Sequence, residues 1–168
     1  MPPRALRVAT AASHIIGADM QIAVIGSGAE RAEQAEEVGR LLAERGCVVV
    51  CGGLGEVMEA AARGAKSAGG TTVGILPGES PRDANPWIDY AVATGTGHAR
   101  NLAVVASCEA AVAVGGRWGT LAEVAFARLL GRPVVALGAG PGAEGDGIEH
   151  AETPAEAVEL ALDLVGRR

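Results

Sequence analysis

The chain has 168 residues, of which 49% are hydrophobic but only 2% aromatic, and it carries a net charge of -6 at pH 7. This length predicts one domain, with a core of small aliphatic side chains around many glycines. The acidic charge argues against a nucleic-acid partner, because phosphate backbones are bound by clustered Lys and Arg. The sequence has no apolar run of about 18 residues that would predict a membrane span, so we expect a cytoplasmic protein without a membrane partner.

The first half of the chain repeats a unit of strand, glycine turn and helix. Residues 1–19 show no clear period, and we expect them to form a mobile extension before a domain that spans residues 20–168. Apolar runs without exposed polar positions are typical of strands covered on both faces. In this half the sequence predicts strands over residues 21–26, 47–53 and 71–76, and helices over residues 30–45 and 55–70.

The second half begins with the longest polar stretch of the chain, residues 79–95. It contains Trp87 and Tyr90, which either cover a ligand or seal the sheet edge or a subunit contact. Near the C-terminus, Thr153, Pro154 and Glu156 predict the N-cap, first position and capping box of a terminal helix. The predicted elements are strands over residues 88–94, 110–114 and 133–137, helices over residues 97–108, 120–130 and 153–166, and an acidic loop over residues 138–147.

This alternation predicts an α/β fold, a single doubly wound Rossmann-like domain with a parallel sheet of about six strands and helices on both faces. Ligands of such folds bind at the carboxyl ends of the strands. Glycine turns that open a helix attract anions, phosphate above all, because the first N–H groups of the helix are free. The predicted ligand-binding residues lie in three such turns: Gly26, Ser27, Gly28, Gly52, Gly53, Gly55, Gly115, Gly116, Arg117, Trp118, Gly119 and Thr120.

Several common cofactors do not fit these residues, and we expect none to be required. The pattern GSGAE lacks the third glycine of a dinucleotide fingerprint, which disfavours NAD, and the P-loop pattern is absent. Pyridoxal phosphate needs a Schiff-base lysine, but the only lysine, Lys66, lies near the end of a predicted helix. Cys47, Cys51 and Cys108 border apolar runs and are expected to be buried hydrophobes, so no disulfide or metal site is predicted.

The motifs GGLGEVMEAAARGA, TGTGHARN and GGRWGTLAE, in this order, resemble those of the Rossmann-like lonely-guy phosphoribohydrolases, once labelled lysine decarboxylases. The resemblance covers residues 20–166 and is closer still to the bacterial branch related to molybdenum-cofactor carrier proteins. It implies a nucleotide, phosphate or molybdenum cofactor bound over the glycine turns, and a homodimer or larger assembly. In the family's enzymes an arginine and a glutamate cleave the N-glycosidic bond of nucleoside 5'-monophosphates, and the matching positions are Arg100 and Glu123.

Three positions depart from the pattern of the enzymes. Arg117 replaces the second glycine of the last motif, Asn101 stands where the enzymes carry lysine, and Glu56 occupies a position usually held by glycine. Asn101 is common in the carrier-like branch. Retention of Arg100 and Glu123 favours a nucleotide N-glycosidase, whereas Arg117 and Asn101 favour a non-catalytic carrier of a nucleotide-like ligand such as a pterin cofactor. The sequence leaves both functions open.

The candidate catalytic residues each have a structural alternative. Glu123 can stabilise positive charge on a ribosyl group, or it can form a capping box with Thr120. Arg100 can hold phosphate through a charge-assisted fork, or it can form a surface ion pair. Asn101 would add a neutral hydrogen bond to the ligand.

Three further polar residues lie in the same motifs. His98 can donate to a ligand or be structural, and Ser27 fits a phosphate contact or an N-cap equally well. Glu56 is interpreted as a partner of the helix dipole in a first turn. The alanine-rich helices that begin near Glu56 and Thr120 have apolar surface beyond what one sheet face needs, which also predicts a homodimer or larger assembly.

Overall fold

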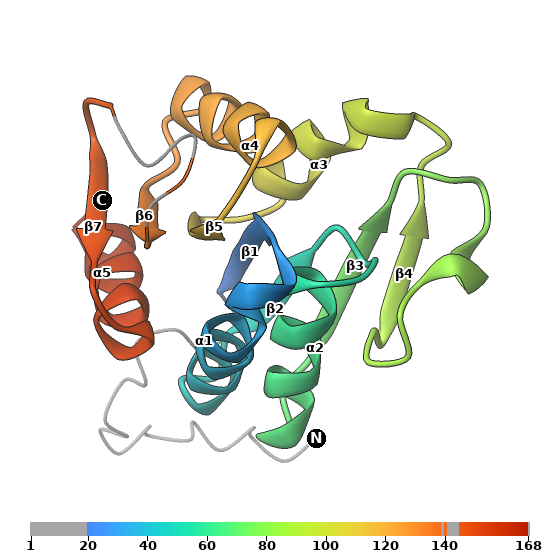
Figure 1. Ribbon diagram of the computed structural model, residues 1–168, viewed down its shortest axis with the longest axis horizontal. Coiled ribbons are helices and arrows are strands. Elements are labelled where there is room, and N and C mark those ends of the chain that lie inside the picture. Colours follow the sequence, from blue (N-terminus) through green and yellow to red (C-terminus); the bar gives the residue numbers. More distant parts are fainter. Residues whose placement is uncertain (1–19, 139, 141–144, 168) are drawn as a thin grey trace, which may run out of the picture.

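The computed structural model describes residues 20–138, 140 and 145–167. The predicted extension over residues 1–19 and residues 139 and 141–144 of the predicted acidic loop lie outside the described part. The described residues form one parallel sheet with helices on both faces (Figure 1). This confirms the predicted doubly wound α/β fold.

The sheet has seven strands in the order β4-β3-β2-β1-β5-β6-β7, and every neighbouring pair is parallel. The chain winds outward from β1 to β4, returns to β5 beside β1, and winds outward again to β7. The switch point of this doubly wound sheet therefore lies between β1 and β5. The strands are β1 (Gln21–Ser27), β2 (Val48–Cys51), β3 (Thr72–Leu76), β4 (Tyr90–Ala93), β5 (Ala110–Gly115), β6 (Val134–Leu137) and β7 (Ile148–Ala151).

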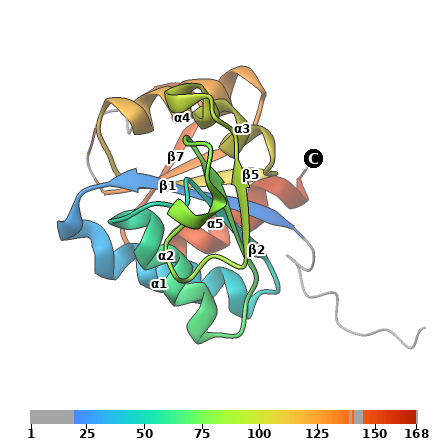
Figure 2. The ribbon, with the colours of Figure 1, turned by 90° about the vertical axis from the view of Figure 1, so that its right-hand side faces the viewer.

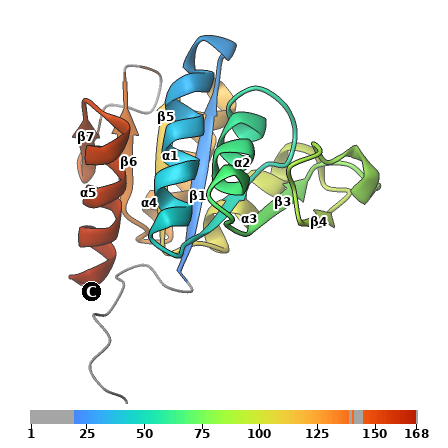
Figure 3. The same cartoon turned by 90° about the horizontal axis from the view of Figure 1, so that it is seen from below.

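Two helical layers cover the sheet, with α1, α2 and α5 on one face and α3 and α4 on the other (Figures 2 and 3). Alternation along β1 supplies both layers, because Ile22 and Val24 belong to the first core cluster and Ala23 and Ile25 to the second. The α-helices are α1 (Ala32–Glu44), α2 (Val57–Ser67), α3 (Arg100–Ala106), α4 (Trp118–Leu129) and α5 (Pro154–Gly166), and three short 3-10 helices span Ala29–Arg31, Pro81–Asp83 and Gly97–Ala99.

The predicted count of about six strands is too low by one, because β7 was missed. Its residues Ile148–Ala151 pair with β6, from Val134 opposite Ile148 to Leu137 opposite Ala151. The two central residues of β7 are exposed, so the strand lacks the apolar run by which the other strands were recognised. Pairing with β6 makes these residues a strand, and their own composition does not reveal it.

The start of α5 follows the sequence prediction. Thr153 is the N-cap, its side chain accepts a hydrogen bond from the Glu156 backbone N–H at 3.2 Å, and Pro154 follows at the first helical position. The Glu156 carboxylate accepts from the Glu152 backbone N–H at 2.8 Å. Among the described residues, no helix combines the length and apolar character needed to cross a membrane. Cys47, Cys51 and Cys108 are free and buried, as expected from their apolar surroundings.

Helices α1 and α2 pack closely because each presents a glycine to the backbone of the other. A Cβ atom on Gly39 would overlap the carbonyl oxygen of Ala61, and one on Gly64 would overlap the carbonyl oxygen of Glu36. Neither glycine has a positive φ, so their role here is close approach and not backbone conformation. The small side chains of the sequence thus allow two helices to lie almost in backbone contact.

Gly39→Ala and Gly64→Ala are each expected to lower the free energy of unfolding by about 1–3 kcal/mol, because the added methyl group overpacks the α1–α2 contact. At an ordinary glycine inside a helix, substitution by alanine instead raises the free energy of unfolding by roughly 0.5–1 kcal/mol. Gly166→Ala is the control, since no atom lies within 4 Å of the position that its Cβ would take. Urea unfolding followed by circular dichroism measures the effect, and a more stable Gly39→Ala protein would contradict the close contact.

Candidate functional site

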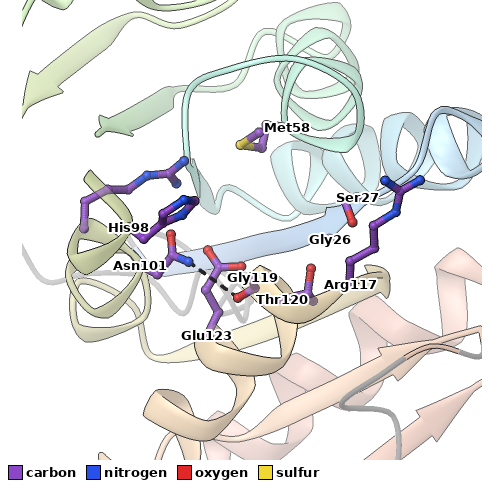
Figure 4. A pocket seen from close by; sticks show the side chains of 10 residues that line it. Gly26, Ser27, Met58, His98, Asn101, Arg117, Gly119, Thr120 and Glu123 are labelled. Atoms are coloured by element: carbon purple, nitrogen blue, oxygen red, sulfur yellow. Dashed lines mark hydrogen bonds between the residues drawn. The ribbon is translucent and has the colours of Figure 1, made fainter. Parts of the chain in front are cut away.

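A cavity of about 290 Å³ opens at the carboxyl ends of β1 and β5, where the winding of the chain switches (Figure 4). Doubly wound proteins bind their ligands at this position. Four segments contribute its lining, namely the end of β1, the start of α2, the segment that enters α3, and the start of α4. The lining residues are Gly26, Ser27, Met58, His98, Arg100, Asn101, Arg117, Gly119, Thr120 and Glu123.

Arg100 is a partly buried cation without an ion pair. Its guanidinium group lies against Gly52, where a Cβ atom would overlap Nη1. The Nε atom is buried and has no hydrogen-bond partner, and among the described residues no carboxylate oxygen comes within 4.0 Å of the guanidinium. Burial lowers the pKa of Arg100, which the charge of Glu123 partly opposes. The alternative of a surface ion pair therefore does not hold, and Arg100 retains unused donors beside the cavity.

Glu123 is a buried carboxyl group on α4 with only 7% of its surface exposed. Burial raises its pKa from 4.5 to about 7, and the charge of Arg100 limits this rise. The alternative of a capping box with Thr120 is wrong, because α4 begins at Trp118 with Arg117 as cap residue and has no side-chain cap. Thr120 lies inside the first turn. The spacing of Thr120 and Glu123 suits a helix interior as well as a helix start, so the sequence could not separate the two.

Asn101 links the two helices that flank the cavity. Its Nδ2 atom donates to the carbonyl oxygen of Gly119 at a long 3.5 Å, drawn as a dashed line in Figure 4. Asn101 is 7% exposed and Thr120 is 3% exposed, so both polar side chains are held inside. His98 and Arg117 are exposed and lie at opposite ends of the cavity in Figure 4. The cavity thus has a polar floor and a rim with one imidazole and one guanidinium group.

The turn after β1 excludes one of the two roles predicted for Ser27, the N-cap. The Oγ atom of Ser27 is buried without a hydrogen-bond partner, and the N-cap position of the following 3-10 helix is taken by Gly28. The backbone N–H of Gly28 donates to Oε2 of Glu56 at 2.9 Å. Ser27 is therefore available to a ligand, whereas the N–H of Gly28 already has an acceptor.

Glu56 has an unusual backbone conformation, with φ 56° and ψ -124° at the N-cap of α2. Among the described residues it is the one non-glycine residue with positive φ. Such a conformation costs a side-chain-bearing residue about 1–3 kcal/mol. The prediction of a simple dipole partner for α2 is incomplete, because the side chain of Glu56 makes no cap hydrogen bond to its own helix and reaches the β1 turn instead.

Eight of the predicted site residues line the cavity, and Met58 and His98 join them. His98 lies in the motif TGTGHARN and Met58 in GGLGEVMEA, so both belong to motifs that indicated the site. The direction of the Met58 side chain depends on how α2 packs on the sheet, which the motif does not show. Trp118 is 79% exposed and does not line the cavity, although its neighbours Arg117 and Gly119 do, and neither Trp87 nor Tyr90 lines it. The predicted residues outside the lining are Gly28, Gly52, Gly53, Gly55, Gly115, Gly116 and Trp118.

Several of these glycines still shape the site. Gly115 and Gly116 have φ values of 61° and 137°, and a Cβ atom on Gly116 would lie 2.6 Å from Cβ of Thr120. Gly52 leaves the space that the Arg100 guanidinium fills. Among the described residues there is no group of three or more His, Cys, Asp or Glu side chains placed to hold a metal ion.

The raised pKa of Glu123 predicts a pH-dependent stability. A carboxyl group whose pKa is higher in the folded than in the unfolded state stabilises the protein below pH 4.5, and this contribution is lost as the pH rises through about 7. Relative to Glu123→Gln, wild type is therefore expected to lose roughly 2–4 kcal/mol of unfolding free energy across this interval. Urea unfolding at several pH values measures the difference. Glu33→Gln, on the exposed side of α1, is the control, and parallel curves for wild type and Glu123→Gln would contradict the shift.

Comparison with known proteins agrees with the motifs. Residues 19–162 match the model of the SLOG cluster4 family. An uncharacterized protein of Archaeoglobus fulgidus is 45% identical over 146 residues, which are 85% of this chain and 95% of that protein. The structure of the molybdenum cofactor binding protein from Rippkaea orientalis matches with a TM-score of 0.83 and 33% identity, over 88% of this chain and 98% of that chain. The molybdenum cofactor carrier protein of Chlamydomonas reinhardtii matches with a TM-score of 0.79 and 33% identity, over 88% and 99% of the two chains. These matches confirm the resemblance, and the chain belongs to the SLOG cluster4 family.

Proposed function

We propose that this protein binds a phosphorylated, nucleotide-like heterocyclic ligand in the cavity between β1 and β5 and acts as its carrier. The observation that carries the proposal is Arg100, a partly buried guanidinium group with an unpartnered Nε atom beside an open cavity. Buried polar groups in native proteins almost always have partners, and leaving one without costs about 1–3 kcal/mol. A bound anion supplies the missing partner for Arg100.

The electrostatics of the cavity favour phosphate as that anion. The chain carries a net charge of -6, yet the cavity presents Arg100 from one side and Arg117 from another. The first turn of α4 adds backbone N–H groups at the positive end of the helix dipole. Ser27 contributes a hydroxyl group without a partner. Phosphate is an acceptor that suits each of these donors, and we assign the phosphate group of the ligand to the first turn of α4, on the side that faces Arg100.

The size of the cavity favours a position near the rim for the rest of the ligand. A volume of about 290 Å³ is at the lower end of the range for small-molecule sites. It holds a phosphate ester and part of a sugar or fused ring, while the heterocycle extends toward His98 and Met58. Trp118 offers an exposed aromatic face between two lining residues, Arg117 and Gly119. We assign His98, Met58 and Trp118 to the heterocycle because stacking and sulfur contacts suit flat aromatic rings.

Molybdenum cofactor, a pterin that carries a phosphate group, is the first ligand to test. Two proteins of similar fold and 33% identity bind or carry it according to their names. Asn101 and Arg117, where the hydrolases have other residues, support the same choice. In this proposal the cofactor is cargo that the protein holds for another enzyme, so no resident cofactor is required.

Hydrolysis of nucleoside 5'-monophosphates is a second candidate function, and one observation favours it. Glu123 has a pKa near 7, which suits a group that must be charged in one step and neutral in another. Cleavage of a ribosyl bond builds positive charge on the sugar, and a buried carboxylate stabilises such charge strongly. Arg100 would hold the 5'-phosphate while Glu123 faces the ribose.

We further propose that the protein is a homodimer. Of the two helices that the sequence predicts at the subunit contact, α2 and α4, only α4 remains a candidate. The apolar side of α2 is not available, because Val57, Ala60, Ala61 and Ala65 are buried in the core beneath α1. Helix α4 keeps Leu129 at 82% exposure. A subunit contact over α4 would cover this side chain, and light scattering that gives a monomeric mass at micromolar concentration would contradict it.

Arg100→Ala is expected to weaken binding of the phosphorylated ligand by about tenfold or more, because phosphate loses a charge-assisted partner. Isothermal titration with molybdenum cofactor released from a purified molybdoenzyme, and with a panel of nucleoside monophosphates, measures the affinity. Arg63→Ala is the matched control, since Arg63 forms a surface ion pair with Glu36 away from the cavity. The carrier proposal fails if wild type binds none of these ligands, or if both variants bind equally well.

Glu123→Gln separates the two candidate functions. In a hydrolase this change should leave nucleotide affinity nearly intact but slow base release at least about a hundredfold, since the lost charge acts mainly in the transition state. Chromatography of free base after incubation with each nucleoside monophosphate measures the rate. A carrier releases no base in either form. Equal release by wild type and Glu123→Gln would show that another group performs the reaction.

A further inference from the structure

We propose that Glu56 is a specificity-determining residue that limits the cavity to ligands with a single phosphate group. Its carboxylate occupies the anion position of the β1 turn through the hydrogen bond from the Gly28 N–H to Oε2 at 2.9 Å. A ligand phosphate is then left with the β5–α4 turn, and a second phosphate group at the β1 turn would meet a negative charge. This inference rests on the proposed function and specifies its ligand class.

The two turns lie side by side, so without Glu56 a diphosphate would reach both. Strands β1 and β5 are parallel neighbours, and Ser27 at the end of β1 is opposite Gly115 at the end of β5. Neighbouring strands lie about 4.8 Å apart. Two phosphate groups that share one bridging oxygen span such a distance. The β5 turn opens the long helix α4, whereas the β1 turn opens only the 3-10 helix Ala29–Arg31, and the donor that a second phosphate group would need there is the Gly28 N–H, which Glu56 occupies.

The placement of Glu56 is held by its surroundings. Its carbonyl oxygen accepts the Ala60 N–H at 3.0 Å in the first turn of α2, and the next residue, Val57, is fully buried. These contacts fix the backbone at a φ of 56°, a value that glycine adopts easily and glutamate does not. The side chain therefore leaves the helix start in a direction set by a strained backbone, and its carboxylate rests on the β1 turn.

A second carboxylate lies at the Gly28 end of the β1 turn. It belongs to Glu30 and is close enough to Gly28 that a Cβ atom there would overlap it. Arg100 and Arg117 lie among the other lining residues of the cavity, toward α3 and α4. Arg31 also belongs to the β1 turn, but its side chain lies against Gly115 and Gly138. The repulsion of an anion is therefore local to the Gly28 N–H, where the two carboxylates gather. Neutral donors, such as ribose hydroxyl groups or an exocyclic amine, suit this position beside the carboxylates.

Titration calorimetry with AMP and ADP tests the inference, with inorganic phosphate and pyrophosphate as a pair that lacks the base. Magnesium is omitted so that the charge of ADP is not masked. Glu56→Gln keeps the length of the side chain and an acceptor for Gly28 but removes the charge, and Glu56→Gly also frees the N–H and relieves the backbone. Glu59→Gln, in the first turn of the same helix, is the matched control.

Wild type and Glu59→Gln are expected to bind the monophosphate at least about tenfold more tightly than the diphosphate, a difference of about 1.4 kcal/mol. Glu56→Gln should reduce this preference to a few-fold, and Glu56→Gly should abolish or reverse it. An unchanged ratio in both Glu56 variants, or a wild type without preference, overturns the inference while the proposed function stands. If none of the four proteins binds any of these probes, the inference is overturned, and the separate titration with molybdenum cofactor decides the proposed function.

Discussion

The pairing of β1 with β5 is the constraint on which the candidate site depends. The chain leaves β1 toward α1 on one face of the sheet and leaves β5 toward α4 on the other, so the two turns diverge and a cavity opens between them. Gly26 has a φ of 147°, and in this conformation a Cβ atom would overlap the carbonyl oxygen of Val114 on the neighbouring strand. Gly26 is therefore needed for the pairing of β1 with β5, whether or not a ligand is bound. A side chain there would push the two central strands apart.

Arg100 and Glu123 make opposite demands on this cavity. Burial favours the neutral form of each group, and each charge favours the charged form of the other. Near pH 7 Glu123 is partly protonated, so the positive charge of Arg100 is only partly balanced and the cavity attracts an anion. Above that pH the carboxylate weakens the attraction. The charged form of Glu123, which would stabilise a ribosyl cation, is thus the form that favours phosphate binding less. A raised pKa of Glu123 would therefore help a carrier to bind phosphate, whereas a hydrolase would need the charged form for its reaction.

Local patterns in the sequence were sufficient for the elements that carry their own signal. Apolar runs predicted the buried strands, and Thr153, Pro154 and Glu156 predicted the start of α5. Features that depend on distant partners were missed or misread. Strand β7 exists because β6 pairs with it, and the contact between Gly28 and Glu56 joins residues 28 positions apart. Glu123 was identified as a site residue from a motif, but its burial, and hence its pKa, follows from how α4 packs on the sheet.

Departures from ordinary protein structure gather around this one cavity. Of the three buried side-chain atoms without a hydrogen-bond partner among the described residues, Ser27 Oγ and Arg100 Nε belong to its lining, and the third, on Arg132, lies elsewhere. Glu123 is buried without an ion pair to Arg100, and Glu56 holds a backbone conformation that costs it free energy. Each of these features destabilises the fold, and the dense packing of small residues between α1, α2 and the sheet offsets them. Single substitutions at these positions would remove the unfavourable features. Their presence together around one cavity therefore supports a bound ligand, and this argument does not depend on similarity to other proteins.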